Sequence, residues 1–385
     1  MAQKLKTDWI LFITTLCMVT IGILIVYSAS SIMAEVDARY HSTWHFVTRQ
    51  AAWAIVAVAV MMALKRTPYT KLKNPAVALS VISISLLLLV AVLVMDPANH
   101  RWLRLGWGPL GVQPSEMAKP ALVIFLSFFV TWRARAINNP RYTLIPAALA
   151  VGFVILLVVV ADLGTAIVLA AAAALVFFVA GLEMRYCAIV GVLAMIGLAY
   201  FICAKPYRLG RVIRFFDPQF TTIAKIDKSG ALKARLEESL TTRDTNYQLE
   251  QSQVAVGVGG VTGLGLMNGR QKLLYLPEAH KDFIYAVAGE ELGMIGTAGL
   301  LVGFLIIFWR GLRTAVRMKH DDFGRYLALG LTVVVVVQGF IHMSVVLGMM
   351  PTKGIPLPMI SYGGSSLLST MASLGMLMNV SEHAG

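Results

Sequence analysis

The sequence is divided into long apolar runs, and this feature restricts the possible folds more than any other. A helix of about 20 apolar residues spans the hydrocarbon core of a bilayer. Such runs occur at about 9–29, 46–64, 75–95, 116–132, 143–161, 164–182, 185–204, 283–309, 323–349 and 360–379. Because backbone exposed to lipid must satisfy its own hydrogen bonds, each run is predicted to be helical. We predict an all-α polytopic membrane protein, one domain over 1–385 with about ten transmembrane helices.

The composition supports a membrane protein, and the placement of charge predicts its orientation. The chain is 58% hydrophobic and only 14% charged, which is too apolar for a soluble domain. Its net charge of +13 is spread over short loops rather than gathered into one patch, so no nucleic-acid partner is predicted. Lysines and arginines concentrate in the loops on one side, which predicts that this side and both termini are cytoplasmic. The three cysteines are too scattered to predict a disulfide framework or a zinc site.

One loop, at about 205–282, is much longer than the others and lies on the predicted extracytoplasmic side, between the seventh and eighth runs. Its last part, YQLEQSQVAVGVGGVTGLGLMNG, contains six glycines within an apolar stretch. It matches neither a dinucleotide fingerprint nor a P-loop. We interpret it as a re-entrant or surface-lying segment in which glycine permits close backbone packing.

Ionisable groups near the membrane are the candidate functional residues, because charge is costly there. Glu116 and Lys119 are three residues apart and share one helix face, which fits either a structural ion pair or a functional pair. Asp162 lies between the fifth and sixth runs, where it either caps the sixth helix or serves the site. Asp282 opens the eighth run, and the same two interpretations apply to it.

Two further acids lie deeper in the eighth run. Helical spacing places Glu290 about a quarter turn from the Asp282 face and Glu291 opposite it, so we expect that both cannot face one cavity equally. His280 is notable only for its position two residues before Asp282. His41 and His45 are four apart, but no third metal ligand is near them in the sequence.

Five separate motifs carry a resemblance to a known family. They are RQKLLYLPEAHKDFIYAVAGEELG, RWLRLGWGPLGVQPSEMAKP, ADLGTAIVL, RFFDP and MPTKGIPLPMISYGGSSLL. Together they resemble the SEDS family, the FtsW, RodA and SpoVE proteins of bacterial cell-wall synthesis, over nearly the whole chain. The TKGIPLP form is similar to the FtsW branch.

The resemblance implies a ten-span helical enzyme of the bacterial cytoplasmic membrane. The implied activity is an inverting peptidoglycan glycosyltransferase that polymerises lipid II on the outer face, releases undecaprenyl pyrophosphate and serves septal synthesis in cell division. It also implies a class B penicillin-binding protein and other division proteins as partners. The family's essential aspartate falls on Asp282, its QPSE–K pair on Glu116 and Lys119, and its DLGT aspartate on Asp162.

The chain departs from the family pattern at two places. Lys281 stands where the family usually has threonine, which adds a cation beside the predicted catalytic acid. The stretch 219–246 is longer than the usual loop, so its conformation is not predicted.

The expected chemistry assigns a role to each predicted site residue. Asp282 would act as the base that removes a proton from the attacking sugar hydroxyl. The leaving pyrophosphate needs cations, for which Lys119, Lys281, Arg101 and Arg104 are candidates, or a divalent ion such as Mg²⁺ or Mn²⁺ with ligands still unknown. The predicted substrate-binding residues are Glu116, Lys119, Asp162, His280, Lys281, Glu290, Arg101 and Lys353.

Three other functions stay open from the sequence. A lipid II flippase would use Glu290 and Asp162 to line a polar path through the bilayer. A RodA-like elongation polymerase would share the chemistry but not the role in division, and a scaffold for the penicillin-binding protein would have no catalysis.

The small and branched residues of two runs predict how their helices pack. We expect the glycine face of the eighth run, with Gly289, Gly293 and Gly296, to pack inside the bundle. We expect the valine-rich ninth run, with Val334 and Val337, to face lipid or a partner helix.

Overall fold

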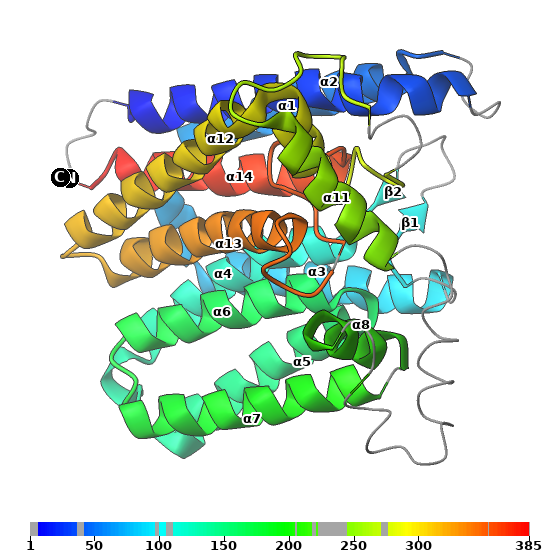
Figure 1. Ribbon diagram of the computed structural model, residues 1–385. Helices are drawn as coiled ribbons and strands as arrows, with labels where there is room; N and C mark the ends of the chain where they lie inside the picture. Colours follow the sequence, from blue (N-terminus) through cyan, green and yellow to red (C-terminus); the bar gives the residue numbers. More distant parts are fainter. Residues whose placement is uncertain are drawn as a thin grey trace.

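The computed structural model describes residues 7–36, 42–96, 100–104, 111–204, 206–217, 221, 245–270, 276–352 and 354–384. Long helices run side by side in one bundle, with short helices and a two-stranded hairpin at one end (Figure 1). The first half comprises α1 (Trp9–Val36), α2 (His45–Arg66), η1 (Tyr69–Lys73), α3 (Pro75–Met95), β1 (Leu103–Arg104), β2 (Gly111–Val112), α4 (Pro114–Trp132), η2 (Ala134–Ala136), η3 (Pro140–Leu144), α5 (Ile145–Ala161) and α6 (Leu163–Val179). The second half comprises α7 (Met184–Cys203), α8 (Pro206–Phe216), α11 (Thr245–Gly259), α12 (Ile284–Arg317), α13 (Asp322–Val346) and α14 (Gly364–Ser381).

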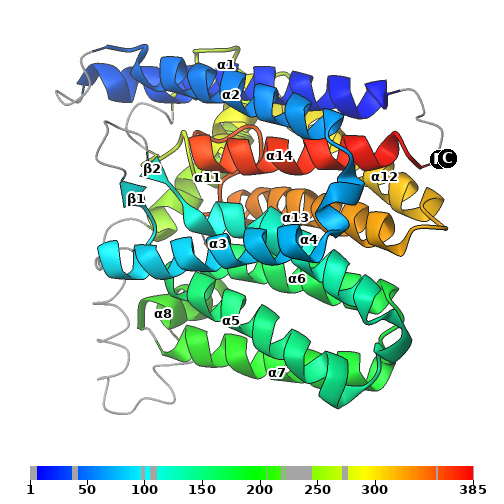
Figure 2. The same ribbon diagram turned by 180° about the vertical axis from the view of Figure 1, so that it is seen from behind.

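The predicted membrane-spanning architecture is confirmed, and each of the predicted runs coincides with a helix. Among the described residues, 8 helices are long and apolar enough to cross a membrane, and α6 is a shorter apolar helix. The predicted separation of α5 from α6 is also correct, because Asp162 has an extended conformation between them. The last helix, α14, is more polar than these 8 helices. It packs against α2, α4 and α13 inside the bundle (Figure 2).

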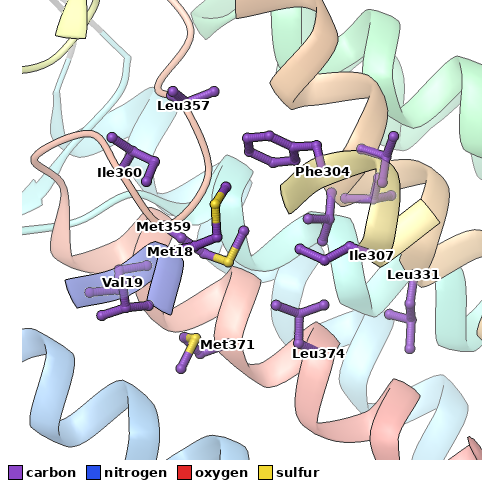
Figure 3. Close-up of a cluster of buried hydrophobic side chains, with 14 of the residues drawn as sticks. Met18, Val19, Phe304, Ile307, Leu331, Leu357, Met359, Ile360, Met371 and Leu374 are labelled. Atoms are coloured by element: carbon purple, nitrogen blue, oxygen red, sulfur yellow. The ribbon is translucent and has the colours of Figure 1, made fainter. Parts of the chain in front are cut away.

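The described residues form two apolar clusters. One lies among α3, α4, α5 and α6, and the other lies where α1, α12, α13 and α14 meet. Figure 3 shows Met18 and Val19 of α1 beside Phe304 of α12 and Met371 of α14, together with Leu357 of the loop that precedes α14. This loop, residues 354–363, therefore packs into the bundle through Leu357. Its first residue, Gly354, lies at the candidate site.

The predicted exposure of the ninth run is wrong. Val333, Val334, Val335 and Val336 are all buried, and α13 contacts α4, α6, α12 and α14. Branched side chains fill the space at the centre of a helical bundle as well as they face lipid, so their apolarity alone does not distinguish the two positions.

The prediction for the glycines is correct at two positions of α12. A Cβ on Gly289 would lie 2.9 Å from Val256 of α11, and a Cβ on Gly293 would collide with the backbone at 261–263. By contrast, the atoms nearest to a Cβ on Gly296 belong to Leu292 of its own helix, and a Cβ on Gly299 would meet nothing within 4 Å.

The glycine-rich segment after α11 packs directly on an interruption of α12. Gly293 has φ 65° and ψ −163°, which breaks the helical hydrogen-bonding there. The amides of Leu264 and Gly265 donate to the carbonyls of Glu290 and Glu291, each at 3.0 Å. In return, the amide of Met294 donates to the carbonyl of Gly260 at 2.9 Å. The expected close backbone packing is therefore present, because the segment supplies the hydrogen bonds that α12 gives up.

Candidate active site

The candidate site lies at the end of the bundle away from both chain termini, next to the hairpin, α8 and the start of α12 (Figure 1). Four segments that are distant in sequence meet there. They are the strand region near Arg101, the α5–α6 junction at Asp162, helix α8, and the loop around Gly354, which lies against Asp282.

Asp282 is held just before α12 rather than at its cap. The helix begins at Ile284 with Phe283 in the N-cap position, and the Asp282 amide donates to the carbonyl of Glu278 at 3.1 Å. The side chain lies against Gly354, where an added Cβ would collide with its carboxylate. A capping role therefore does not explain Asp282, and its carboxylate faces the loop across the site.

The surroundings of Asp282 raise the pKa of its carboxyl group to about 6. Burial is the main cause, because it penalises the charged form. Arg101 and Lys281 act in the opposite direction, whereas the negative charges of Glu278 and Asp162 add to the increase. The group is therefore mainly ionised at neutral pH while it keeps an appreciable affinity for a proton.

Asp162 caps α6 and also lies near Arg101. Its carboxylate caps α6 by accepting from the Gly164 amide at 2.8 Å and from the Thr165 hydroxyl at 2.7 Å. The same carboxylate lies 3.8 Å from the Arg101 guanidinium. Asp162 is buried, so the cap and the arginine together compensate its charge.

Two arginines of α8, Arg208 and Arg211, join Arg101 at the site. Arg211 donates to the carbonyl of Thr352 at 3.1 Å, and burial lowers the pKa of its guanidinium to about 10 although Asp282 raises it. Arg208 donates to the carbonyl of Val159 at 3.1 Å, and Asp162 partly offsets the lowering of its pKa by burial. These arginines were not predicted, although the spacing in RLGRVIR places both on one helix face.

Glu116 and Lys119 form a fully buried ion pair. The Lys119 ammonium lies 2.6 Å from Glu116 Oε2 and 2.5 Å from Gln338 Oε1. The Gln338 amide donates in turn to the carbonyl of Pro356 at 2.8 Å. The predicted pairing is thus present, and it connects α4 and α13 to the loop that carries Gly354.

His280 and Lys281 connect the loop before α12 to the loop before α14. The ring of His280 is buried between Phe46 and Tyr362, and this burial lowers its pKa to about 4, so the ring is neutral at pH 7. The Lys281 ammonium lies 2.7 Å from Glu278, and the Lys281 carbonyl accepts from the Ser361 hydroxyl at 2.6 Å.

Comparison with known proteins identifies the family. A family model described as "Cell cycle protein", which covers FtsW, RodA and SpoVE, matches residues 8–385. The chain belongs to the FtsW/RodA/SpoVE family.

Relatives and solved structures in the FtsW/RodA/SpoVE family match the chain over nearly its whole length. A protein of Geobacter sp. (strain M18) named "Probable peptidoglycan glycosyltransferase FtsW" is 36% identical over 98% of this chain and 97% of its own. Stage V sporulation protein E of Bacillus subtilis is 33% identical over 99% of each chain. A solved structure described as "Structural coordination of polymerization and crosslinking by a peptidoglycan synthase complex" covers 99% of each chain with TM-score 0.71 and 26% identity. Thermus thermophilus RodA covers 98% of this chain and 97% of its own, with TM-score 0.66 and 25% identity.

Glu290 and Glu291 are buried side chains of α12 and lie apart from Asp162 and Asp282. Glu290 accepts from the Arg270 amide at 2.6 Å, and Glu291 accepts from the Ser28 hydroxyl at 2.6 Å. A Cβ on Gly269 would lie 2.8 Å from Glu290 and 3.0 Å from Glu291. Both side chains therefore reach the segment at 269–270, and the expectation that they cannot face one cavity equally stays a prediction.

Few side chains of the described residues could act as ligands for a metal ion. Within the described ranges, no group of three or more His, Cys, Asp or Glu side chains is placed to hold one. Asp282 and Asp162 are carboxylates that lie near the arginines of the site. Lys353, a predicted substrate-binding residue, lies outside the described residues, as do His41 and the side chain of Arg104.

Proposed function

We propose that this protein is a peptidoglycan glycosyltransferase that polymerises lipid II and releases undecaprenyl pyrophosphate for septal cell-wall synthesis. The observation that carries this proposal is the Asp282 carboxylate, whose pKa is raised to about 6. It lies at one end of a membrane bundle, near Arg101 and Arg211, and Arg208 lies near the neighbouring Asp162. The names of the FtsW relatives support the same activity and the role in division.

In the proposed reaction, Asp282 accepts the proton of the sugar 4-hydroxyl of one substrate molecule. The hydroxyl oxygen forms a bond to the anomeric carbon of the second substrate as the bond from that carbon to the diphosphate oxygen breaks. A base on one side of the anomeric carbon and a leaving group on the other invert its configuration. General base catalysis of this kind contributes about 10²–10⁴-fold to the rate.

The arginines provide the charge that the leaving diphosphate requires. Arg101, Arg208 and Arg211 each donate to a backbone carbonyl, which holds the guanidinium groups in place before substrate arrives. Guanidinium groups form paired, charge-assisted hydrogen bonds to phosphate oxygens and stay protonated. Bound Mg²⁺ or Mn²⁺, held by Asp162 and the diphosphate, would add further positive charge for the leaving group.

The substrate and the partners follow from the membrane setting. A polyprenyl tail can stay in lipid while its diphosphate reaches polar groups at the end of the bundle. We place this end outside the cytoplasmic membrane and both termini in the cytoplasm, as the distribution of lysine and arginine indicates. A class B penicillin-binding protein is the proposed partner, together with other division proteins, because a solved structure similar to this chain is described as a peptidoglycan synthase complex.

A flippase for lipid II is the second candidate. Glu290 and Glu291 are buried within the bundle and are the observation that favours it. The polar groups beside Asp282 nevertheless gather at one end, where chemistry would occur, and not along a path through the bundle.

Replacing Asp282 distinguishes the candidates. Purified protein with its penicillin-binding partner and lipid II should form glycan strands, and Asp282→Asn should reduce the rate by about 10²–10⁴-fold. Asp322→Asn is a matched control, because Asp322 is only half-buried, lies at the other end of the bundle and pairs with Arg325. Polymerisation at the normal rate by a correctly folded Asp282→Asn variant would refute the proposal. Transport of lipid II without polymer by the wild-type protein would favour the flippase.

A further inference from the structure

A polar cavity is formed by the start of α1 and the ends of α12 and α14. These helix ends lie at the end of the bundle that carries both termini, opposite the hairpin and α8 (Figure 1). The volume of the cavity is about 240 Å³. Its walls are formed by Thr7, Asp8, Trp9, Ile10, Arg310, Arg313, Thr314, Arg317, Ser381 and Ala384.

The cavity has an excess of positive charge. Arg310 is neutralised by Asp8, since two guanidinium nitrogens lie 2.7 Å from Asp8 Oδ2. Arg313 and Arg317 form no ion pair with any residue that the structure describes. Glu382, near the C-terminal wall, is instead paired with Lys65 at 3.4 Å.

Apolar surfaces lead from the lipid phase to this cavity. Val302, Leu305 and Trp309 form an exposed stripe along α12, and Arg313 continues that stripe one turn after Trp309. Trp9 is 61% exposed and also lines the cavity, at the point where α1 begins. A tryptophan at this level is typical of the boundary between headgroups and hydrocarbon.

We propose that this cavity binds the phosphodiester headgroup of an anionic phospholipid. Arg313 and Arg317 donate to the phosphate oxygens, and Thr7 and Ser381 form part of the cavity wall. The acyl chains lie against the stripe of α12 that ends at Trp309. An acidic protein segment would use the arginines but would leave this apolar stripe without a role, which favours a lipid. A lipid bound here joins the start of α1 to the end of α12 and α14.

The test uses the full-length protein purified in a mild detergent, with native mass spectrometry as the readout of bound lipid. Wild-type protein should retain phosphatidylglycerol in preference to phosphatidylcholine. The double variant Arg313→Gln/Arg317→Gln should bind phosphatidylglycerol more weakly by on the order of tenfold or more, because each arginine near the surface attracts anionic lipid. The matched control is Arg135→Gln/Arg141→Gln, which removes the same charge from exposed residues outside the cavity and should bind normally.

A second arm separates a lipid from other anions. Trp309→Ala should weaken the binding of phosphatidylglycerol and leave any binding of inorganic phosphate unchanged. Three results would overturn the proposal: equal retention of both lipids by the wild type, equal loss in the two double variants, or tighter binding of inorganic phosphate or a polyglutamate peptide than of phosphatidylglycerol. None of these measurements involves lipid II polymerisation, so the result is independent of the proposed activity.

Discussion

At the residue scale, the position of Asp282 determines what its carboxylate can do. A carboxylate in water has little affinity for a proton at neutral pH, whereas burial raises the pKa of Asp282 to about 6. Arg101 and Lys281 limit that increase, so the group stays ionised under working conditions. The residues around the Asp282 carboxylate therefore set its pKa in a range that suits a general base.

This tuning predicts the pH dependence of the reaction. Below the pKa of about 6 Asp282 is protonated and cannot accept the proton of the attacking hydroxyl, so kcat/KM should fall on the acid side with an apparent pKa near 6. Polymerisation of lipid II by the purified complex between pH 5 and 8 measures this. A constant rate down to pH 5 would contradict the role of Asp282.

The raised pKa of Asp282, which suits a base, lowers the stability of the folded protein at neutral pH. Because the folded pKa of Asp282 is above its value of 3.8 in the unfolded chain, ionisation between these values favours unfolding. Asp282→Asn removes that cost, so its Tm at pH 7.5 should equal or exceed that of the wild type while its activity is lost. Thermal unfolding of both proteins provides the folding control for the activity assay.

At the scale of elements, a buried ion pair and a helix interruption hold the site in place. The Glu116–Lys119 pair reaches the loop at Pro356 through Gln338, and His342 of α13 contacts the carbonyl of Ile355 at 2.6 Å. Both connections end within two residues of Gly354, which lies against Asp282. The pair thus positions the loop from inside the bundle, and its substrate-binding role stays a prediction.

Removing one partner of this pair should cost more than removing both. Lys119→Ala leaves the buried Glu116 without its cation, for which the expected loss of stability is about 3–5 kcal/mol. The double variant Glu116→Gln/Lys119→Ala leaves no buried charge and should lose less stability than Lys119→Ala alone. Unfolding measurements on the two single variants and the double variant form a cycle, and strictly additive losses would show that the pair is not coupled.

The interruption of α12 at Gly293 can be tested by a substitution there and a control substitution in the same helix. Gly293→Ala places a Cβ against the backbone at 261–263 in a conformation with φ 65°, so it should lower both Tm and polymerisation. Gly299→Ala is the control, because a Cβ there meets nothing within 4 Å and alanine favours a helix by up to about 1 kcal/mol. Equal effects of the two variants would show that the backbone exchange with residues 260–265 contributes little.

At the scale of the whole molecule, the helices differ in how much of their surface other helices cover. Helix α13 lies at the centre, whereas α7 is largely exposed along its length and packs mainly on α8. A partner's anchor helix therefore cannot reach α13 without displacing other helices.

Cysteine labelling tests this arrangement. After the natural Cys17, Cys187 and Cys203 are replaced by serine, Val334→Cys should resist a membrane-permeant maleimide and should not crosslink to the partner's anchor helix. Met184→Cys, at the start of α7 and 68% exposed, lies where a thiol can ionise and should react at least about tenfold faster. Comparable labelling at the two positions would show that α13 is accessible.

The sequence by itself determined the class of fold, the helical segments and the family, because a bilayer accepts few backbone structures and the apolar runs have its thickness. It also indicated Asp282, Asp162 and the Glu116–Lys119 pair, since ionisable groups stand out against an apolar background. Tertiary structure alone decided which helix lies at the centre, because valine is equally compatible with lipid and with a protein interior. It also decided that Arg208 and Arg211 join Asp162 and Asp282. That charge cluster depends on the packing of α8 across the α5–α6 junction and the loop before α14, and such contacts between distant segments leave no local pattern in the chain.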